Sequence, residues 1–382
     1  MAPGGAAGYA ARAAAARALL ARERLDALLV LDLLNVRYLC GFTGSNGLLV
    51  LLPGRGVLFT DSRYTLQARQ ETRGVEVVEA ADLDRAAAAL LGRVGASYVG
   101  FQPTSLTVAR RSRLGRLMAA DLVEVGSGVD RLRIRKGEDE VGKLTAAARL
   151  AEEALAAAAR HLRPGATEAE LALAFQIASL KRGAEALAFD TIVAGGPRGA
   201  LPHARPTDRR FREGDLVVVD FGVRLDGYCS DETVTLPVGP VDAVDERARG
   251  VYEIVYQAQR AALEALRPGV PLADVDRAAR DVIRAAGYGD RFGHGTGHGV
   301  GLAVHEAPTV SSRSDDVAEA GAVVTVEPGI YLPGEFGVRL EDTVRVTPGG
   351  YERITSVPKE LGAAGKWLRE HARSRGGSLG PD

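Results

Sequence analysis

Three of the six histidines in this 382-residue chain lie in one glycine-rich segment, GHGTGHGVGLAVHE. His294 and His298 are four positions apart, and His305 follows seven residues after His298. Histidines at i and i+4 on a helix can bind zinc, but four glycines in seven residues disfavour a helix here. Glycine also lets a backbone approach a ligand closely. The segment is therefore interpreted as a ligand-binding loop, the alternative being a flexible loop with incidental histidines.

The remaining histidines give weaker signals. His203 lies in LPHARP, where a loop histidine without a catalytic role is the ordinary interpretation. His161 is near the end of an expected helix and His371 is in the C-terminal segment, so both are expected to be unremarkable surface residues.

Two aspartates flank a predicted β-hairpin. The apolar run 216–223 contains Asp220 and is followed by Asp226-Gly227, a two-residue turn signal, and then by Asp231. In such a hairpin, directly opposed residues have position numbers with an odd sum, and this holds for 220 and 231. We therefore expect both carboxylates on one face, as diagonal neighbours close enough to bind adjacent ions.

A second pair of acids, Glu327 and Glu341, lies further along the chain. The stretch 338–346 alternates as a strand would, with one apolar face and one polar face. The polar face comprises Arg339, Glu341, Thr343 and Arg345, and the apolar face Val338, Leu340, Val344 and Val346. Taken alone, alternating charges of this kind usually indicate a sheet face in contact with solvent.

An internal duplication connects the two pairs of acids. LRPG occurs at 162–165 and again 104 residues later, LVVVDFG matches VVTVEPG, and DETV at 231–234 matches EDTV at 341–344. Asp220 and Glu327 are 107 residues apart, and Asp231 and Glu341 are 110 apart. Three matches in the same order predict two copies of one supersecondary unit. Packed face to face, the copies would bring four carboxylates together.

The elements around these residues indicate two domains. Residues 1–125 alternate β-rich runs (27–31, 48–52, 57–60, 75–78, 98–101 and 122–125) with helical patterns, which is typical of an α/β domain. Residues 126–140 are polar and charged, and a long helix is expected over 138–162. The expected organisation is an α/β domain at 1–130, a catalytic domain at 137–362, and a loose Gly-, Ser- and Arg-rich tail at 363–382.

Composition excludes several classes of protein. The net charge of −1 argues against a nucleic-acid or membrane-surface protein, and no apolar run reaches the ~18 residues of a membrane span. Two cysteines, Cys40 and Cys229, cannot form a disulfide framework, and no apolar run of signal-peptide length precedes Leu28. A cytoplasmic location is expected.

The residues quoted above resemble the pita-bread metallopeptidases, the fold of methionine aminopeptidases, aminopeptidase P, prolidase and creatinase. VDFG, SDET, GHGTGHGVGLAVHE, VEPGIY and RLED occur in the family's order, and NVRYLCGFTGSNG at 35–47 and FTDSR at 59–63 resemble bacterial aminopeptidase P-like enzymes. The resemblance implies an α+β pita-bread catalytic domain with pseudo-two-fold symmetry and five metal ligands: Asp220, Asp231, His298, Glu327 and Glu341.

Charge arithmetic agrees with a pair of cations in such a site. Two divalent ions would neutralise four carboxylates that are costly to bury unpaired. Oxygen ligands with one imidazole suit Mn²⁺, Co²⁺ or Zn²⁺, and the resemblance favours Mn²⁺. Asp231 and Glu341 are expected to bridge the ions, and a hydroxide shared by the ions is expected to be the nucleophile.

The resemblance also implies a reaction. Glu327 would transfer protons, His203 and His305 would stabilise the oxyanion, Arg339 would orient a carboxylate, and His294 is counted with these catalytic residues. The expected enzyme is an Xaa-Pro aminopeptidase acting on proline-containing peptides, and a homodimer. The alternatives are an Xaa-Pro dipeptidase (prolidase) and, from another class, a catalytically silent pita-bread binding module.

Overall fold

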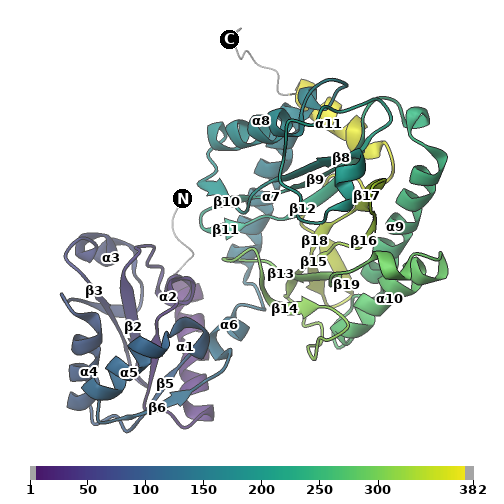
Figure 1. Ribbon diagram of the computed structural model, residues 1–382. Coiled ribbons are helices and arrows are strands. Elements are labelled where there is room, and N and C mark those ends of the chain that lie inside the picture. The colour runs from purple at the N-terminus through teal and green to yellow at the C-terminus, as the bar shows by residue number, and fades with distance from the viewer. Residues whose placement is uncertain (1–5, 375–382) are drawn as a thin grey trace. The chain divides into compact units, whose positions relative to one another are not determined.

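The computed structural model describes residues 6–374. The chain divides between Arg133 and Ile134 into two compact units, each described here by itself (Figure 1). This division lies within the polar segment 126–140.

The first unit is an α/β domain on a six-stranded mixed sheet, in the order β4-β3-β2-β1-β5-β6. All six β-rich runs predicted from the sequence are strands: β1 (Ala27–Val30), β2 (Gly47–Leu51), β3 (Gly56–Thr60), β4 (Val75–Glu79), β5 (Tyr98–Phe101) and β6 (Asp121–Glu124). The helices are α1 (Ala6–Arg22), α2 (Leu33–Cys40), α3 (Thr65–Glu71), α4 (Leu83–Arg93), α5 (Val108–Leu117) and α6 (Gly128–Leu132). The central strands β1 and β2 are buried along their whole length, which explains their uninterrupted apolar sequences.

The second unit contains the predicted duplication. The first repeat consists of α7 (Glu138–Ala158), α8 (Glu168–Lys181), β8 (Ile192–Gly195), β9 (Leu216–Phe221) and β12 (Glu232–Pro237). The second repeats this order as α9 (Glu246–Ala265), α10 (Leu272–Ala285), β13 (Gly297–Gly299), β15 (Val323–Val326) and β18 (Asp342–Thr347). In both sheets the middle strand is the equivalent one, since β9 lies between β8 and β12 and β15 lies between β13 and β18. The duplication inferred from the sequence is confirmed.

Shorter elements complete this unit. They are β7 (Ala186–Leu187), β10 (Val223–Leu225), β11 (Tyr228–Cys229), β14 (Glu306–Val310), β16 (Gly329–Leu332), β17 (Phe336–Arg339), β19 (Gly350–Arg353) and α11 (Ala363–Ser374). Each repeat packs its helix pair on its own sheet, and the buried apolar side chains form two large hydrophobic clusters beside a small one of Ile192, Ala194 and Ala204. Among residues 6–374, no helix combines the length and apolarity needed to cross a membrane.

The expectation of a loose tail from residue 363 is wrong for residues 363–374, which form α11. Ala364 and Leu368 lie one helical turn apart and are both buried against the core of the first repeat. The helix was not predicted because the segment is rich in Gly, Ser and Arg, which indicated a loop, and its apolar stripe is short. The rest of the expected tail, 375–382, lies outside the described residues.

The stretch 338–346 is also different from the single, half-solvated strand expected. It is divided into β17 and β18, with Leu340 and Glu341 between them. The backbone N–H of Glu341 donates to Thr233 O in the first repeat at 3.0 Å, so the chain leaves one strand pairing for another. Arg339, Glu341 and Thr343 are buried because their face is covered by the other repeat rather than by water.

Candidate metal centre

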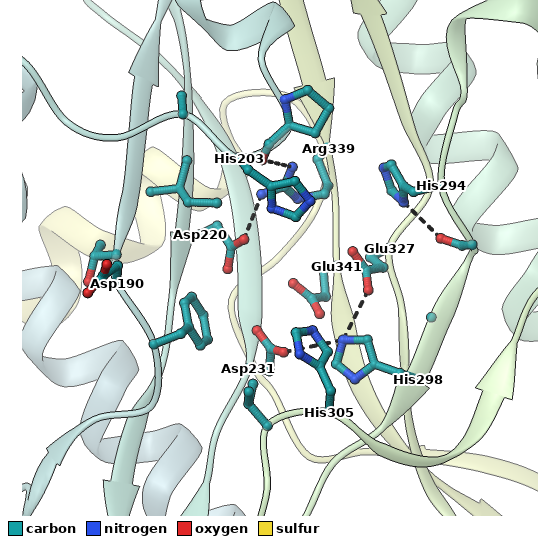
Figure 2. A pocket seen from close by; sticks show the side chains of 18 of the residues that line it. Asp190, His203, Asp220, Asp231, His294, His298, His305, Glu327, Arg339 and Glu341 are labelled. Atoms are coloured by element: carbon teal, nitrogen blue, oxygen red, sulfur yellow. Dashed lines mark hydrogen bonds and ion pairs between the residues drawn. The ribbon is translucent and has the colours of Figure 1, made fainter. Parts of the chain in front are cut away.

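The nine predicted site residues line one cavity of about 520 Å³ in the second unit (Figure 2). Both repeats contribute to it. Asp220 lies on β9 and Asp231 immediately before β12, whereas His298, Glu327 and Glu341 come from the second repeat. His161 and His371 lie elsewhere, His161 beside Arg160 and His371 stacked on Trp367.

The hairpin register places the two aspartates as the sequence predicted. Leu225 pairs with Tyr228 across Asp226-Gly227, and the same register continues to the pair Asp220 and Thr233. Asp226 and Gly227 both have positive φ, 49° and 79°, as a type I′ turn requires. Asp231 is therefore a diagonal neighbour of Asp220 on the same face, and both carboxylates point into the cavity (Figure 2).

The tightest group of ligand atoms joins the two repeats. One donor atom from each of Asp231, His298 and Glu341 lies within 4.8 Å of the others. His298 Nε2 is 3.6 Å from Asp231 Oδ2 and 3.2 Å from Glu327 Oε1. Asp220 and Glu327 line the same cavity but are not part of the 4.8 Å group.

The tautomer of His298 follows from its backbone contact. Its Nδ1 lies 3.1 Å from Gly299 O, and because a carbonyl only accepts, Nδ1 carries the hydrogen. Nε2 then faces the carboxylates, which is the orientation that a metal-ligating histidine needs. Although burial opposes it, the hydrogen bond to Glu327 raises the pKa of His298.

Burial gives the cavity a strong preference for positive charge. It raises the pKa of Asp231 well above its ordinary value, and the charges of Glu341 and Asp220 raise it further. Burial likewise raises the pKa of Glu341 and of Asp220. Four carboxylates in one cavity, two buried and two half-buried, repel one another unless cations compensate them.

The donor set fits divalent metal ions. Asp220 Oδ1 is buried and has no hydrogen-bond partner among residues 6–374, although the other oxygen of that carboxylate is bound. Carboxylate oxygens with one imidazole are the ligands of Mn²⁺, Co²⁺ and Zn²⁺ sites. An orphaned, buried carboxylate oxygen beside this group is accounted for by a bound cation.

Arg339 connects the carboxylates to a chain of polar groups. Its Nη2 donates to Asp220 Oδ2 at 2.6 Å, and its Nη1 donates to Tyr331 Oη at 3.0 Å and to Pro202 O at 3.1 Å. The Pro202 contact holds the loop that carries His203. Arg339 thus fixes both the carboxylate of Asp220 on β9 and this loop.

Tyr331 is a site residue that the sequence interpretation missed. Its Oη lies 2.7 Å from His294 Nε2, and His294 Nδ1 lies 2.8 Å from Gly295 O. The carbonyl requires a hydrogen on Nδ1, so Nε2 accepts from the Tyr331 hydroxyl and His294 is neutral. Burial lowers the pKa of His294, which agrees with this state. The sequence did contain a signal for Tyr331. In an extended chain, alternate positions share a face, so Tyr331 is expected on the same face as Gly329 and Glu327.

His305 and His203 line the cavity at different places, His203 beside Arg339 and His305 beside His298 (Figure 2). The ring of His305 is 4.2 Å from the ring of His298, centroid to centroid. Burial lowers the pKa of His305, and the neighbouring imidazoles of His298 and His203 lower it further. His305 is therefore a neutral N–H donor near neutral pH.

The glycines around His298 have a packing role in addition to the expected one. A Cβ on Gly297 would lie 2.0 Å from Thr325 O, and a Cβ on Gly299 would lie 2.3 Å from Ala307 O. These glycines permit close approach of the neighbouring strands β15 and β14, and Gly297 also lines the cavity. They fix His298 in a short packed strand within a segment that otherwise lines the cavity as a loop.

Comparisons with known proteins agree with this geometry. Residues 142–348 match the model of metallopeptidase family M24, and residues 12–135 match the creatinase/prolidase N-terminal domain. The chain is 40% identical over 348 residues to an uncharacterized peptidase, YqhT, of Bacillus subtilis, covering 90% of this chain and 98% of that protein.

Two solved structures are similar to this chain in both fold and sequence. An Xaa-Pro dipeptidase from Bacillus anthracis superposes with a TM-score of 0.89 at 36% identity, over 92% of this chain and 99% of that one. An X-Pro aminopeptidase from Thermotoga maritima superposes with a TM-score of 0.84 at 35% identity, over 91% of this chain and 98% of that one.

Proposed function

The chain belongs to metallopeptidase family M24, and from this premise we propose that it is a dinuclear Xaa-Pro aminopeptidase, which removes an N-terminal residue that precedes proline. The observation that carries the proposal is the cavity in which four carboxylates and His298 converge from two repeats. Asp220, Asp231, His298, Glu327 and Glu341 would hold two divalent cations, with Mn²⁺ proposed as the physiological metal. When bound, such cations acidify a water molecule and polarise a carbonyl.

The chain's own residues supply the proton transfers and the charge stabilisation. Glu327 accepts the proton of the attacking water and delivers it to the leaving proline nitrogen, which has no hydrogen of its own in the Xaa-Pro bond. His305 and His203 donate to the oxygen on which negative charge develops. His305 is suited to this role because burial keeps it neutral.

Arg339 and the residues bound to it position the reacting groups. Its bond to Asp220 holds that carboxylate in one rotamer, and its bond to Pro202 O holds the His203 loop. Neutral His294 accepts from the Tyr331 hydroxyl, which in turn accepts from Arg339. Fixed geometry of this kind lowers the reorganisation needed in the transition state.

The second candidate is an Xaa-Pro dipeptidase (prolidase), favoured by relatives that carry that name. One is the Xaa-Pro dipeptidase of Pyrococcus horikoshii, 34% identical over 340 residues. The two activities use the same chemistry and differ in whether the substrate can continue past proline.

A matched peptide series distinguishes them. Metal-free protein is reconstituted separately with Mn²⁺, Co²⁺ and Zn²⁺, and kcat/KM is measured for Xaa-Pro, Xaa-Pro-Xaa and Xaa-Ala-Xaa peptides with the same first residue. We expect a higher kcat/KM for the tripeptide than for the dipeptide, because added residues contribute binding energy in the transition state, and little cleavage of the alanine peptide. Cleavage of dipeptides alone would identify a prolidase. Absence of proline-dependent cleavage with every metal would contradict both candidates.

A further inference from the structure

A buried charged group lies behind the metal centre, and no step of the proposed reaction uses it. It consists of Glu232, Asp342 and Lys359, and we call it the back-face cluster. Glu232 follows Asp231 and Asp342 follows Glu341, so each back-face acid is the chain neighbour of a metal-centre acid. Because side chains alternate along a strand, the back-face acids point away from the cavity, whose lining does not include them.

One ammonium group contacts both back-face acids. Lys359 Nζ donates to Glu232 Oε1 and lies 3.6 Å from Asp342 Oδ1. The side chains of Lys359 and Asp342 have no exposed surface, and that of Glu232 is 2% exposed. Glu232 and Asp342 occupy equivalent positions in the two repeats, so Lys359 joins the repeats at matching points.

The two acids depend on Lys359 to different degrees. Asp342 also accepts from Thr355 Oγ1 at 2.8 Å and from Gln259 Nε2 at 3.2 Å, and it lies 3.4 Å from Arg353 Nε. Glu232 Oε2, in contrast, has no hydrogen-bond partner in the described part of the chain. Lys359 itself is anchored through its backbone, since its carbonyl accepts from the Tyr252 hydroxyl at 2.9 Å.

The cost of this arrangement argues for a role other than stability. Burying an ion pair requires desolvation of each charge, and well-packed apolar residues of similar volume are often as stabilising or more so. A buried cluster that ties equivalent strands together is better explained by what it does to their neighbours. One peptide unit separates each back-face acid from a carboxylate of the metal centre.

We propose that Lys359 is a positioning residue for the metal centre. By tying Glu232 to Asp342, it holds the adjacent Asp231 and Glu341 at the separation that a pair of divalent cations requires. The inference rests on the proposed dinuclear centre and deepens it, since it assigns the spacing of the Asp231 and Glu341 carboxylates to a group outside the cavity. Because Glu232 depends on Lys359 more than Asp342 does, we expect loss of Lys359 to displace Asp231 more than Glu341.

Metal binding tests this role without reference to turnover. Full-length metal-free protein is titrated with MnCl₂ by calorimetry and with CoCl₂ by visible absorption, which reports the coordination of the bound ion. We expect Lys359→Met to weaken binding of at least one of the two ions by about 10- to 100-fold, the usual effect of removing a group that orients a ligand. The Co²⁺ spectrum should change with it.

Two further variants separate positioning from stability. Lys136→Met also removes a buried ammonium, from an ion pair whose side chains are 1% and 2% exposed, but Glu306, its partner, is not next to a metal-centre acid. It should bind both ions as the wild type does. The triple variant Glu232→Gln/Asp342→Asn/Lys359→Met leaves no unpaired charge among these three residues, and the nearby buried Glu152 keeps its hydrogen bonds from Ser356. This variant is expected to fold even where Lys359→Met does not. A positioning role requires weakened binding in the triple variant as well.

The outcomes distinguish this inference from the proposed function. In one outcome the wild type binds two ions, and Lys359→Met and the triple variant bind them with the wild-type affinities. This result would overturn the inference and leave the proposed function intact. Equal weakening in Lys136→Met would also overturn it, because the effect would then follow from lost stability. A wild type that binds fewer than two ions would contradict the dinuclear centre itself.

Discussion

Arg339 donates to Oδ2 of Asp220 at 2.6 Å and leaves Oδ1 of the same carboxylate buried without a hydrogen bond among residues 6–374. The guanidinium therefore selects one rotamer of Asp220 in which the free oxygen is available to a cation. The contact joins the end of β17 in the second repeat to β9 in the first.

Replacing Arg339 should affect metal binding as well as catalysis. Arg339→Lys keeps the positive charge but cannot reach Asp220, Tyr331 and Pro202 together, because a lysine lacks the planar fork of donors. We expect about a 10-fold or greater loss of metal affinity, measured by calorimetry. Tyr331→Phe is the control, since it removes one partner of Arg339 and leaves the Asp220 contact intact. Unchanged affinity in Arg339→Lys would refute the orienting role.

Removing a central ligand should abolish activity and leave the fold in place. Asp231 belongs to the group of donor atoms within 4.8 Å. We expect Asp231→Ala to lose bound metal, measured by mass spectrometry of the purified protein, and to lose peptidase activity, with little change in circular dichroism. Near-native turnover with full metal occupancy would mean that the dinuclear assignment is wrong.

The histidines should separate into a catalytic and a neutral class. His305→Ala should retain metal and lose about 10²- to 10³-fold in kcat, the usual effect of removing one oxyanion-stabilising donor. His161, whose ring lies beside Arg160 on the surface, provides the matched control, and His161→Ala should have wild-type kcat. Equal effects of the two substitutions would contradict the histidine assignments.

The ion pair of Lys136 and Glu306 should contribute to stability. The two side chains are almost fully buried, with Nζ 2.8 Å from Oε1, and Glu306 directly follows His305. Lys136→Met leaves a buried carboxylate without this partner, which should lower the free energy of unfolding by about 3–5 kcal/mol. Urea denaturation of the metal-free protein measures this change. Lys136→Met/Glu306→Gln should recover much of the stability; no recovery would contradict the ion-pair explanation.

Cys40 should be inert towards thiol reagents in the folded protein. Burial raises its pKa to about 12, so almost no reactive thiolate is present at pH 8, and the reaction rate should rise as the pH approaches that value. In a Cys229→Ser background, where Cys40 is the only thiol of the chain, Ellman's reagent should react slowly with native protein and at once after guanidinium unfolding. Rapid stoichiometric labelling of the native protein at pH 8 would show that the first unit opens readily.

Local periodicity predicted much of this structure. The Asp226-Gly227 turn and strand alternation were enough to place Asp220 and Asp231 on one face, because the register of a short hairpin depends on neighbouring residues alone. The order of the duplicated motifs predicted which acids would meet. These inferences needed no knowledge of long-range packing.

Contacts that depend on the packing of the two repeats could not be predicted in the same way. Thr233 donates to Glu341 Oε2 at 2.7 Å and Thr343 donates to Asp231 O at 2.7 Å, a reciprocal exchange between equivalent residues. Nothing in the local sequence shows this pairing. Lys359 is similar, since a single lysine in a loop is ordinarily exposed and its burial depends on segments more than 100 residues away.

The placement of α11 has a consequence for the synthesis of the chain. Val357, Ala364 and Leu368 belong to the hydrophobic cluster of the first repeat, although they are encoded after the whole of the second. A ribosome translates from the N-terminus, so the first repeat emerges with this part of its core missing. It remains incomplete until α11 has left the exit tunnel. We therefore expect the core of the first repeat to be completed only after the second repeat has been synthesised, in the same step that brings Lys359 to Glu232.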